Sequence, residues 1–165
     1  MSNAPPLALS DLMAKTGFFL SYWSLFEIEL CTAITAAREQ LGDHRRKMPD
    51  GLNTRLDLWL KLVRRLPDAA TLDPIVRAMR DDARRLRNVR NIIVHGLALG
   101  NAQPEDGGPG YIKCLEGGYQ KPTGKDVRYT MADLEHFVQS ADALRRGCKM
   151  GPSFFNYRLP AKYPK

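Results

Sequence analysis

The sequence predicts an all-α fold: an antiparallel four-helix up-and-down bundle with a small β-hairpin or irregular insertion before the last helix. Apolar residues recur every three or four positions in four segments, short polar or glycine- and proline-containing connections join these segments, and only the stretch before the last one alternates. The length of 165 residues and the hydrophobic content of 44% fit one globular domain. We expect a flexible N-terminus over 1–9, the bundle over 10–147 and a proline- and aromatic-rich tail over 148–165.

The first predicted helix runs from about Ser10, which can cap it, to Leu41, where Gly42 stops it. Its 32 residues would span about 48 Å, which is longer than a small bundle needs. We therefore expect this helix to contact a partner subunit as well as the core. Its apolar stripe consists of Phe19, Trp23, Phe26, Leu30, Ala33 and Ala37.

The second predicted helix has Asn53 or Thr54 as its cap and ends at Pro67, and the third begins at Asp73-Pro74. The seam of the second helix is formed by Leu52, Leu56, Trp59, Val63 and Leu66. The stripe of the third helix is formed by Met79, Ala83, Leu86, Arg90, Ile93 and Leu97.

The segment 100–110 is polar and glycine-rich and is expected to be a loop. Residues 111–115 and 126–129 alternate enough to predict a short hairpin. Thr130 and Asp133 then form a predicted capping box for the fourth helix, with Gly147 just past its end. The apolar positions of that helix are Leu134, Phe137, Ala141 and Leu144.

The net charge of +7 is unevenly distributed along the chain. Residues 77–90 contain six arginines and two acids, which is typical of a surface that binds a polyanion such as RNA. Arg80, Arg84 and Arg87 are the candidate nucleic-acid-binding residues. The alternative is a solvated helix face, because acids and arginines in this segment also stand four residues apart.

Several classes of protein are not indicated. No segment has the roughly 18 uninterrupted apolar residues of a membrane span, and the N-terminus lacks the basic region of a signal peptide. The three cysteines are far apart and form no Cys-x-x-Cys pair, which favours reduced thiols in the cytoplasm. The three histidines are equally scattered, so we expect neither a metal site nor a cofactor.

One residue interrupts the stripe of the third helix, because position 90 is arginine. An unpaired buried guanidinium is very costly, so Arg90 must meet an acid, line a cleft or face a partner, unless it reaches solvent from the edge of the stripe. His95 follows five residues later, which turns its side chain about 140° away on a straight helix. A shared site then needs either a distortion near Gly96 or two copies of the chain; a structural histidine is the alternative.

The segment from Leu86 to Gly96 resembles the signature of HEPN domains, in which an arginine and the polar residue after it precede a histidine at a helix end. Arg90, Asn91 and His95 match this signature, with four residues between the arginine and the histidine. In the first helix, Trp23, Glu27 and Leu30 resemble a tryptophan, glutamate and leucine pattern of some small bacterial HEPN-like proteins. The resemblance covers residues 10–147 but not the hairpin or the tail.

The resemblance implies a homodimeric, metal-independent RNA endonuclease, often part of toxin–antitoxin or phage-defence systems. It implies that His95 is general acid or base, that Arg90 stabilises the phosphorane and that Asn91 orients one of them. Trp23 and Glu27 are expected to support this site, with Glu27 close to Arg90 and His95. Toxin members paired with nucleotidyltransferase antitoxins often carry a tyrosine two residues after the histidine, and this chain departs from that pattern with Leu97. The alternative is an inactive HEPN-like module that binds nucleotide, nucleic acid or protein.

Overall fold

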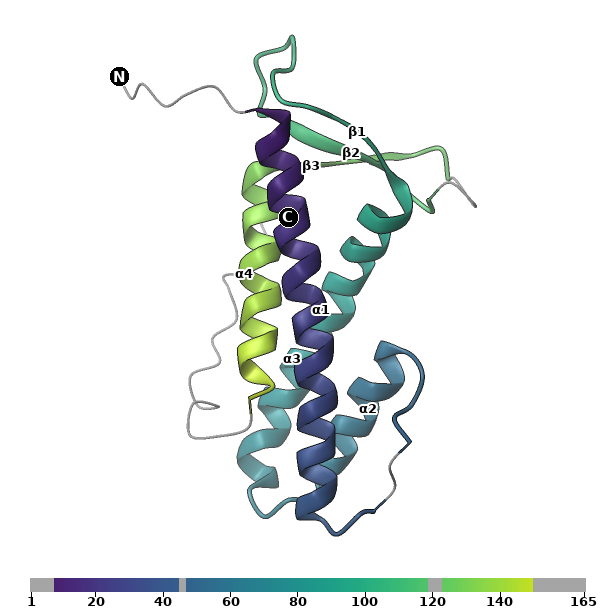
Figure 1. The fold of residues 1–165 in the computed structure, drawn as a ribbon, viewed down its shortest axis with the longest axis vertical. Helices are drawn as coiled ribbons and strands as arrows, with labels where there is room; N and C mark the ends of the chain where they lie inside the picture. The colour runs from purple at the N-terminus through teal and green to yellow at the C-terminus, as the bar shows by residue number, and fades with distance from the viewer. Residues whose placement is uncertain (1–7, 45–46, 119–122, 150–165) are drawn as a thin grey trace, which may run out of the picture. The chain divides into compact units, whose positions relative to one another are not determined.

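The computed structural model describes residues 8–44, 47–118 and 123–149, which form four helices and three strands (Figure 1). The described residues divide into two compact units: those within 8–21 and 87–138 form unit 1, and those within 22–86 and 139–149 form unit 2. Each unit has buried apolar side chains of its own. The helices are α1 (Leu9–Gln40), α2 (Leu52–Val63), α3 (Ala69–Gly96) and α4 (Met131–Gly147), and all but α2 contribute residues to both units.

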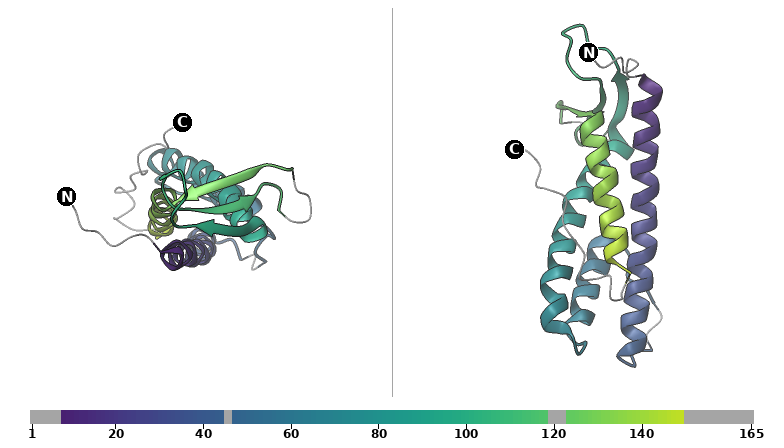
Figure 2. Two further views of the ribbon diagram at one scale, coloured as in Figure 1. Left: turned by 90° about the horizontal axis from the view of Figure 1, so that it is seen from above. Right: turned by 90° about the vertical axis from the view of Figure 1, so that its left-hand side faces the viewer.

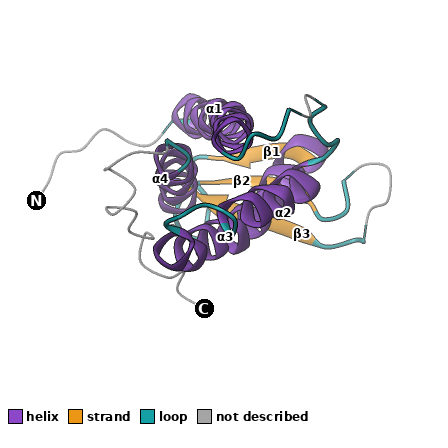
Figure 3. Ribbon diagram, turned by 90° about the horizontal axis from the view of Figure 1, so that it is seen from below, coloured by secondary structure: helices purple, strands orange, loops and turns teal. Residues whose placement is uncertain are grey.

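Unit 1 contains a three-stranded antiparallel sheet, so the prediction of an all-α four-helix bundle is wrong. The strands are β1 (Leu97–Asn101), β2 (Tyr111–Leu115) and β3 (Asp126–Thr130), and they lie side by side in the order β1-β2-β3 (Figures 2 and 3). The predicted hairpin corresponds to β2 and β3 and is confirmed. Strand β1 was not predicted, because its first residue was assigned to the helical stripe and its last two to a loop.

Gly96 is the residue at which helix changes to strand without a connecting loop. A Cβ atom at this position would lie 2.2 Å from the backbone oxygen of Leu115, at the end of β2. Real Cβ atoms are not found this close to backbone, so only glycine allows the end of α3 to approach the sheet in this way. Leu97 then pairs with Cys114 in the first step of β1, with an irregularity before Leu99.

The two faces of the sheet differ in burial. Ile112 and Cys114 of β2 are buried and pair with Tyr129 and Val127 of β3. Tyr129 stacks edge-on against Phe137 of α4 at 5.2 Å, so this is the inner face of the sheet. The opposite, outer face carries the half-buried or exposed residues Tyr111, Lys113, Leu115, Asp126, Arg128 and Thr130.

The helical stripes are confirmed by burial. Every predicted apolar stripe residue of α1, α2 and α4 is buried, and so are Met79, Ala83, Leu86 and Ile93 of α3. Arg90 is half-buried, which fits the alternative that it reaches solvent from the edge of the stripe. Leu97 is the exception, because it belongs to β1.

Two helix ends were predicted correctly. Gly42 has a φ of 64°, and the amides of Gly42 and Asp43 donate to the carbonyls of Glu39 and Arg38, which closes α1 with a Schellman motif. At the start of α4, the amide of Thr130 donates to Asp133 Oδ2 at 2.8 Å. The amide of Asp133 donates back to Thr130 Oγ1 at 3.3 Å, which completes the capping box.

The starts of α1, α2 and α3 and the end of α2 differ from the predictions. Ser10 lies inside α1, which begins at Leu9. Helix α2 begins directly after Gly51 without a side-chain cap, so neither Asn53 nor Thr54 caps it, and it ends at Val63, before Pro67. Helix α3 begins at Ala69, which places Asp73 and Pro74 inside it. The carboxylate of Asp73 binds two arginines there and does not act as a cap.

Candidate functional site

The candidate site residues Arg90, Asn91 and His95 all lie in the last turns of α3, within unit 1. The helix is continuous through Gly96, so the distortion considered for this segment is not found between Arg90 and His95. On a regular helix the Cα–Cβ directions of these two residues remain about 140° apart. The side chains of Arg90 and His95 can therefore contact the same ligand only if their rotamers, or a residue between them, bring the two functional groups closer together.

A hydrogen bond links the first two members of the motif. Arg90 Nη1 donates to Asn91 Oδ1 at 3.2 Å, and both side chains are half-buried. This contact draws the guanidinium towards the side of the helix that carries Asn91. Asn91 and His95 are four residues apart and therefore neighbours on one helical face. The amide of Asn91 thus lies between the arginine and the histidine.

His95 is exposed, while its backbone is closely covered. A Cβ atom on Gly118, in the turn after β2, would lie 2.9 Å from the backbone oxygen of His95 and 3.0 Å from its Cβ atom. Gly118 has a φ of 69°, which also favours glycine. Two glycines, Gly96 and Gly118, therefore allow the backbone around His95 to pack against the sheet while the imidazole remains accessible.

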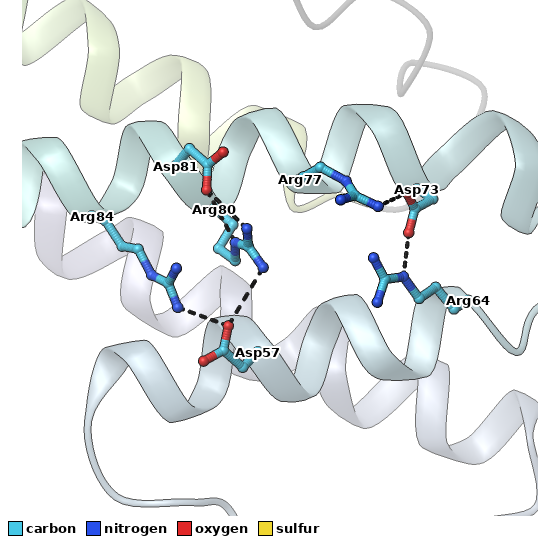
Figure 4. A network of polar contacts seen from close by, with 7 residues as sticks. All are labelled: Asp57, Arg64, Asp73, Arg77, Arg80, Asp81 and Arg84. Carbon is cyan, nitrogen blue, oxygen red and sulfur yellow. Dashed lines mark hydrogen bonds and ion pairs between the residues drawn. The ribbon is translucent and has the colours of Figure 1, made fainter.

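Three arginines of α3 that lie in unit 2, Arg77, Arg80 and Arg84, are engaged by carboxylates (Figure 4). Arg84 Nη2 lies 2.8 Å from Asp57 Oδ1, and Arg80 contacts both Asp57 at 3.7 Å and Asp81 at 3.1 Å. These ion pairs favour the alternative interpretation for Arg80 and Arg84, a solvated face with paired charges.

A second cluster in the same network joins α3 to the segment after α2. Asp73 binds Arg64 at 2.5 Å and Arg77 at 2.8 Å. The hydrogen bond from Arg64, followed by that from Arg77, lowers the pKa of the Asp73 carboxyl below its usual value. Both clusters neutralise charge that the sequence alone assigns to a binding surface.

Arg87 differs from these arginines. It is half-buried, lies four residues before Asn91, and has no carboxylate within ion-pair distance among the residues that the structure describes. Among the described residues, Arg87 and Arg90 are thus the arginines of α3 without a carboxylate partner, and both lie with His95 in unit 1.

Trp23 and Glu27 form a pair in unit 2. The indole Nε1 of the buried Trp23 donates to Glu27 Oε1 at 3.1 Å, and the ring packs on Phe26 at 5.3 Å. Glu27 therefore has a partner on its own helix. Its expected proximity to Arg90 and His95, which belong to unit 1, stays a prediction.

Two residues of the sheet were not predicted as functional. Arg128 of β3 places its guanidinium carbon 4.5 Å from the ring centroid of Tyr111 on β2. The alternating pattern of the hairpin could have placed Tyr111 on an exposed face. The partnership with Arg128 depends on strand register, which the sequence does not reveal.

Comparison of the chain with models of protein families, with curated proteins and with solved structures finds no match. Within the described ranges, no cluster of three or more His, Cys, Asp or Glu side chains is arranged to hold a metal ion. None of the described helices combines the length and apolar character needed to cross a membrane. The resemblance of residues 86–96 to the HEPN signature is therefore the ground on which a functional proposal for Arg90, Asn91 and His95 stands.

Proposed function

We propose that this chain is a metal-independent RNA endonuclease of the HEPN type, acting through Arg90, Asn91 and His95. The observation that carries the proposal is the hydrogen bond between Arg90 and Asn91, one helical turn before an exposed histidine. It groups a phosphate-binding cation, a polar orienting group and an imidazole, the side chain most often used as general acid or base, on one short segment.

The proposed reaction begins with removal of the ribose 2′-hydroxyl proton by the His95 imidazole. The 2′-oxygen attacks the adjacent phosphorus, and the bond from phosphorus to the 5′-oxygen breaks. The products are a 2′,3′-cyclic phosphate and a 5′-hydroxyl end, whose oxygen receives a proton from an imidazolium. Arg90 binds the negative charge that develops on the phosphorane, held towards the substrate by Asn91.

The 2′-oxygen, which loses a proton, and the 5′-oxygen, which gains one, lie on opposite sides of the phosphorus. Two histidines most simply share these two proton transfers, and each chain supplies one His95. We therefore propose a symmetric homodimer that brings two motifs together. Exposed apolar side chains on α1, including Phe18 and Ile28, which are 57% and 62% exposed, support a role for this helix in association. Light scattering is expected to give twice the 18.6 kDa mass of one chain, and a strict monomer would contradict the shared site.

We place this activity in the cytoplasm, where RNA is abundant and where the free thiols Cys31, Cys114 and Cys148 would remain reduced. A toxin–antitoxin or phage-defence system is the proposed setting, with an antitoxin as a further protein partner. The resemblance to HEPN domains supports this setting, and the gene neighbourhood tests it.

The test compares cleavage of single-stranded RNA by the wild type and by His95→Ala in the presence of a chelator. We expect His95→Ala to lower the rate by about 10²-fold or more, which is the usual contribution of a general acid or base. His44→Ala is the matched control, because His44 is exposed and lies in unit 2. Equal cleavage by wild type and His95→Ala would show that the activity does not depend on His95 and would reject the proposal.

A second candidate function is a HEPN-like module that binds nucleotide, nucleic acid or a protein partner without cleaving RNA. It is favoured by one observation: no hydrogen bond to the imidazole of His95 is found among the described residues, whereas a catalytic histidine is commonly oriented by one. In this case neither wild type nor His95→Ala would cleave RNA, while Arg87→Ala would still weaken binding of a polyanion in a salt-dependent way.

A further inference from the structure

We infer that the outer face of the sheet binds the bases of single-stranded RNA, with Tyr111 and Arg128 as the stacking platform. This inference rests on RNA as the proposed substrate class, and it adds a surface that lies beyond the residues of the HEPN signature. In this arrangement the sheet binds the nucleotides on one side of the phosphodiester bond that is cleaved at His95.

The first argument is the geometry of the Tyr111–Arg128 pair. The register places Arg128 opposite Lys113, so Arg128 and Tyr111 are diagonal neighbours on one face of β2 and β3. The guanidinium lies 4.5 Å from the ring centroid, and Arg128 is exposed. Aromatic rings and guanidinium planes on the surface of a sheet are the groups on which unpaired bases stack.

The second argument is charge. The outer face carries two cations, Lys113 and Arg128, and one carboxylate, Asp126. Lys113 Nζ pairs with Asp126 Oδ2 at 2.6 Å, whereas Arg128 has no carboxylate partner among the described residues. The positive charge of Arg128 is therefore available to a phosphate of the RNA backbone while its guanidinium plane remains stacked on the Tyr111 ring.

The third argument is continuity with the candidate catalytic residues. Gly96 and the backbone of His95 abut Leu115 and Gly118, which lie at the end of β2 and in the following turn. From Leu115, β2 leads to Tyr111 in four residues, a distance of about 14 Å at the usual strand rise. A single strand whose scissile phosphate lies at His95 can therefore continue along β2 to the platform.

Binding is measured by fluorescence anisotropy with a labelled single-stranded 2′-O-methyl RNA, which cannot be cleaved by 2′-hydroxyl attack. We expect Tyr111→Ala to weaken binding by about 5- to 150-fold, the range for loss of one stacked base. Tyr111→Phe keeps the ring and should bind like the wild type. The matched control is Tyr22→Ala, which removes a tyrosine near another arginine, Arg145, at 6.0 Å in unit 2, and should leave binding unchanged.

Arg128→Gln provides an independent variant, because an exposed side chain is replaced and the fold content should be unaffected. It should weaken binding and lower the slope of log affinity against log salt by about 1. Wild-type affinity in both Tyr111→Ala and Arg128→Gln, equal loss in Tyr22→Ala, or absence of binding by the wild type would each overturn the inference.

The two proposals fail separately. His95→Ala should bind the 2′-O-methyl RNA like the wild type although it no longer cleaves RNA. Binding that depends on Tyr111 without any cleavage would leave the sheet surface intact and reject the nuclease. Cleavage that depends on His95 but is unaffected, in rate and in KM, by Tyr111→Ala would support the nuclease and reject the sheet surface.

Discussion

Gly96→Ala is expected to destabilise the chain, although glycine-to-alanine changes at helical positions usually do the opposite. The reason is the contact between the end of α3 and β2. An alanine Cβ at this position would lie 2.2 Å from the backbone oxygen of Leu115 and 3.1 Å from its backbone carbon and nitrogen. These atoms belong to a strand that is hydrogen-bonded on both sides, so no flexible side chain can move away to relieve the clash.

The magnitude follows from two opposing terms. Loss of unfolded-state freedom would stabilise the alanine variant by about 0.4–1 kcal/mol if its Cβ had room. Separating the Cβ from the Leu115 oxygen to an ordinary contact distance requires a backbone shift of about 1 Å, and overpacking of this kind costs about 1–3 kcal/mol, occasionally more. We expect the second term to dominate, with a net loss of about 1–2 kcal/mol, or roughly 2–8 °C in Tm for a chain of this length.

Thermal unfolding followed by circular dichroism measures this effect, and Gly17→Ala is the matched control. Gly17 lies inside α1, also in unit 1, and a Cβ there would meet nothing within 4 Å. Gly17→Ala should therefore raise Tm, because alanine is favoured over glycine in helices by about 1 kcal/mol. A Gly96→Ala variant as stable as Gly17→Ala would refute the close approach of α3 to β2.

Two further predictions concern the cap of α4 and the thiols. Thr130→Ala removes the hydroxyl oxygen that accepts a hydrogen bond from the amide of Asp133. It should lower the free energy of unfolding, measured by urea titration, by about 0.5–2 kcal/mol. Thr130→Ser keeps the hydroxyl and should retain most of this stability. Cys31 is half-exposed, whereas Cys114 and Cys148 are buried, and burial raises the pKa of the Cys114 thiol to about 11. With a thiol reagent at pH 8 we therefore expect one rapid equivalent from the native protein and three in denaturant; three rapid equivalents from the native protein would contradict the described burial.

The helices could be predicted from the sequence because their signals are local. A stripe with a period near 3.6 depends only on residues within one segment, and Phe19, Trp23 and Phe26 are buried as that period requires. The hairpin strands and the Thr130–Asp133 cap are equally local. A single polar residue near the start of a helix predicted its cap less well, because α2 begins after Gly51 with no side-chain cap.

Strand β1 could not be predicted because its cause is a tertiary contact. Leu97 fits the helical stripe of α3 by spacing, and Gly100 is a poor strand residue. What ends the helix is the approach of Gly96 to Leu115, which lies 19 residues further along the chain. Because β1 pairs with β2 of the predicted hairpin, the chain forms helices and a three-stranded sheet instead of the expected four-helix bundle.

The helical position of the candidate site residues could be predicted from the sequence, whereas the charge balance around them could not. Arg90, Asn91 and His95 stand together in sequence, and their position at the end of α3 follows from the helical pattern. The pairing of Arg80 and Arg84 with Asp57 joins residues more than 20 positions apart and leaves no sequence signal. The same holds for Arg128 and Tyr111, which are brought together only by strand register.

The most direct test of the central claim uses a DNA oligonucleotide that contains a single ribose, incubated with the protein and a chelator. If His95 activates a 2′-hydroxyl, cleavage occurs only on the 3′ side of that ribose, and the product carries a 2′,3′-cyclic phosphate. His95→Ala at equal concentration and equal helical content should leave the oligonucleotide intact over the same time, while His44→Ala should cleave it. Cleavage at deoxyribose positions, unchanged cleavage by His95→Ala, or an intact oligonucleotide with the wild type would contradict the account.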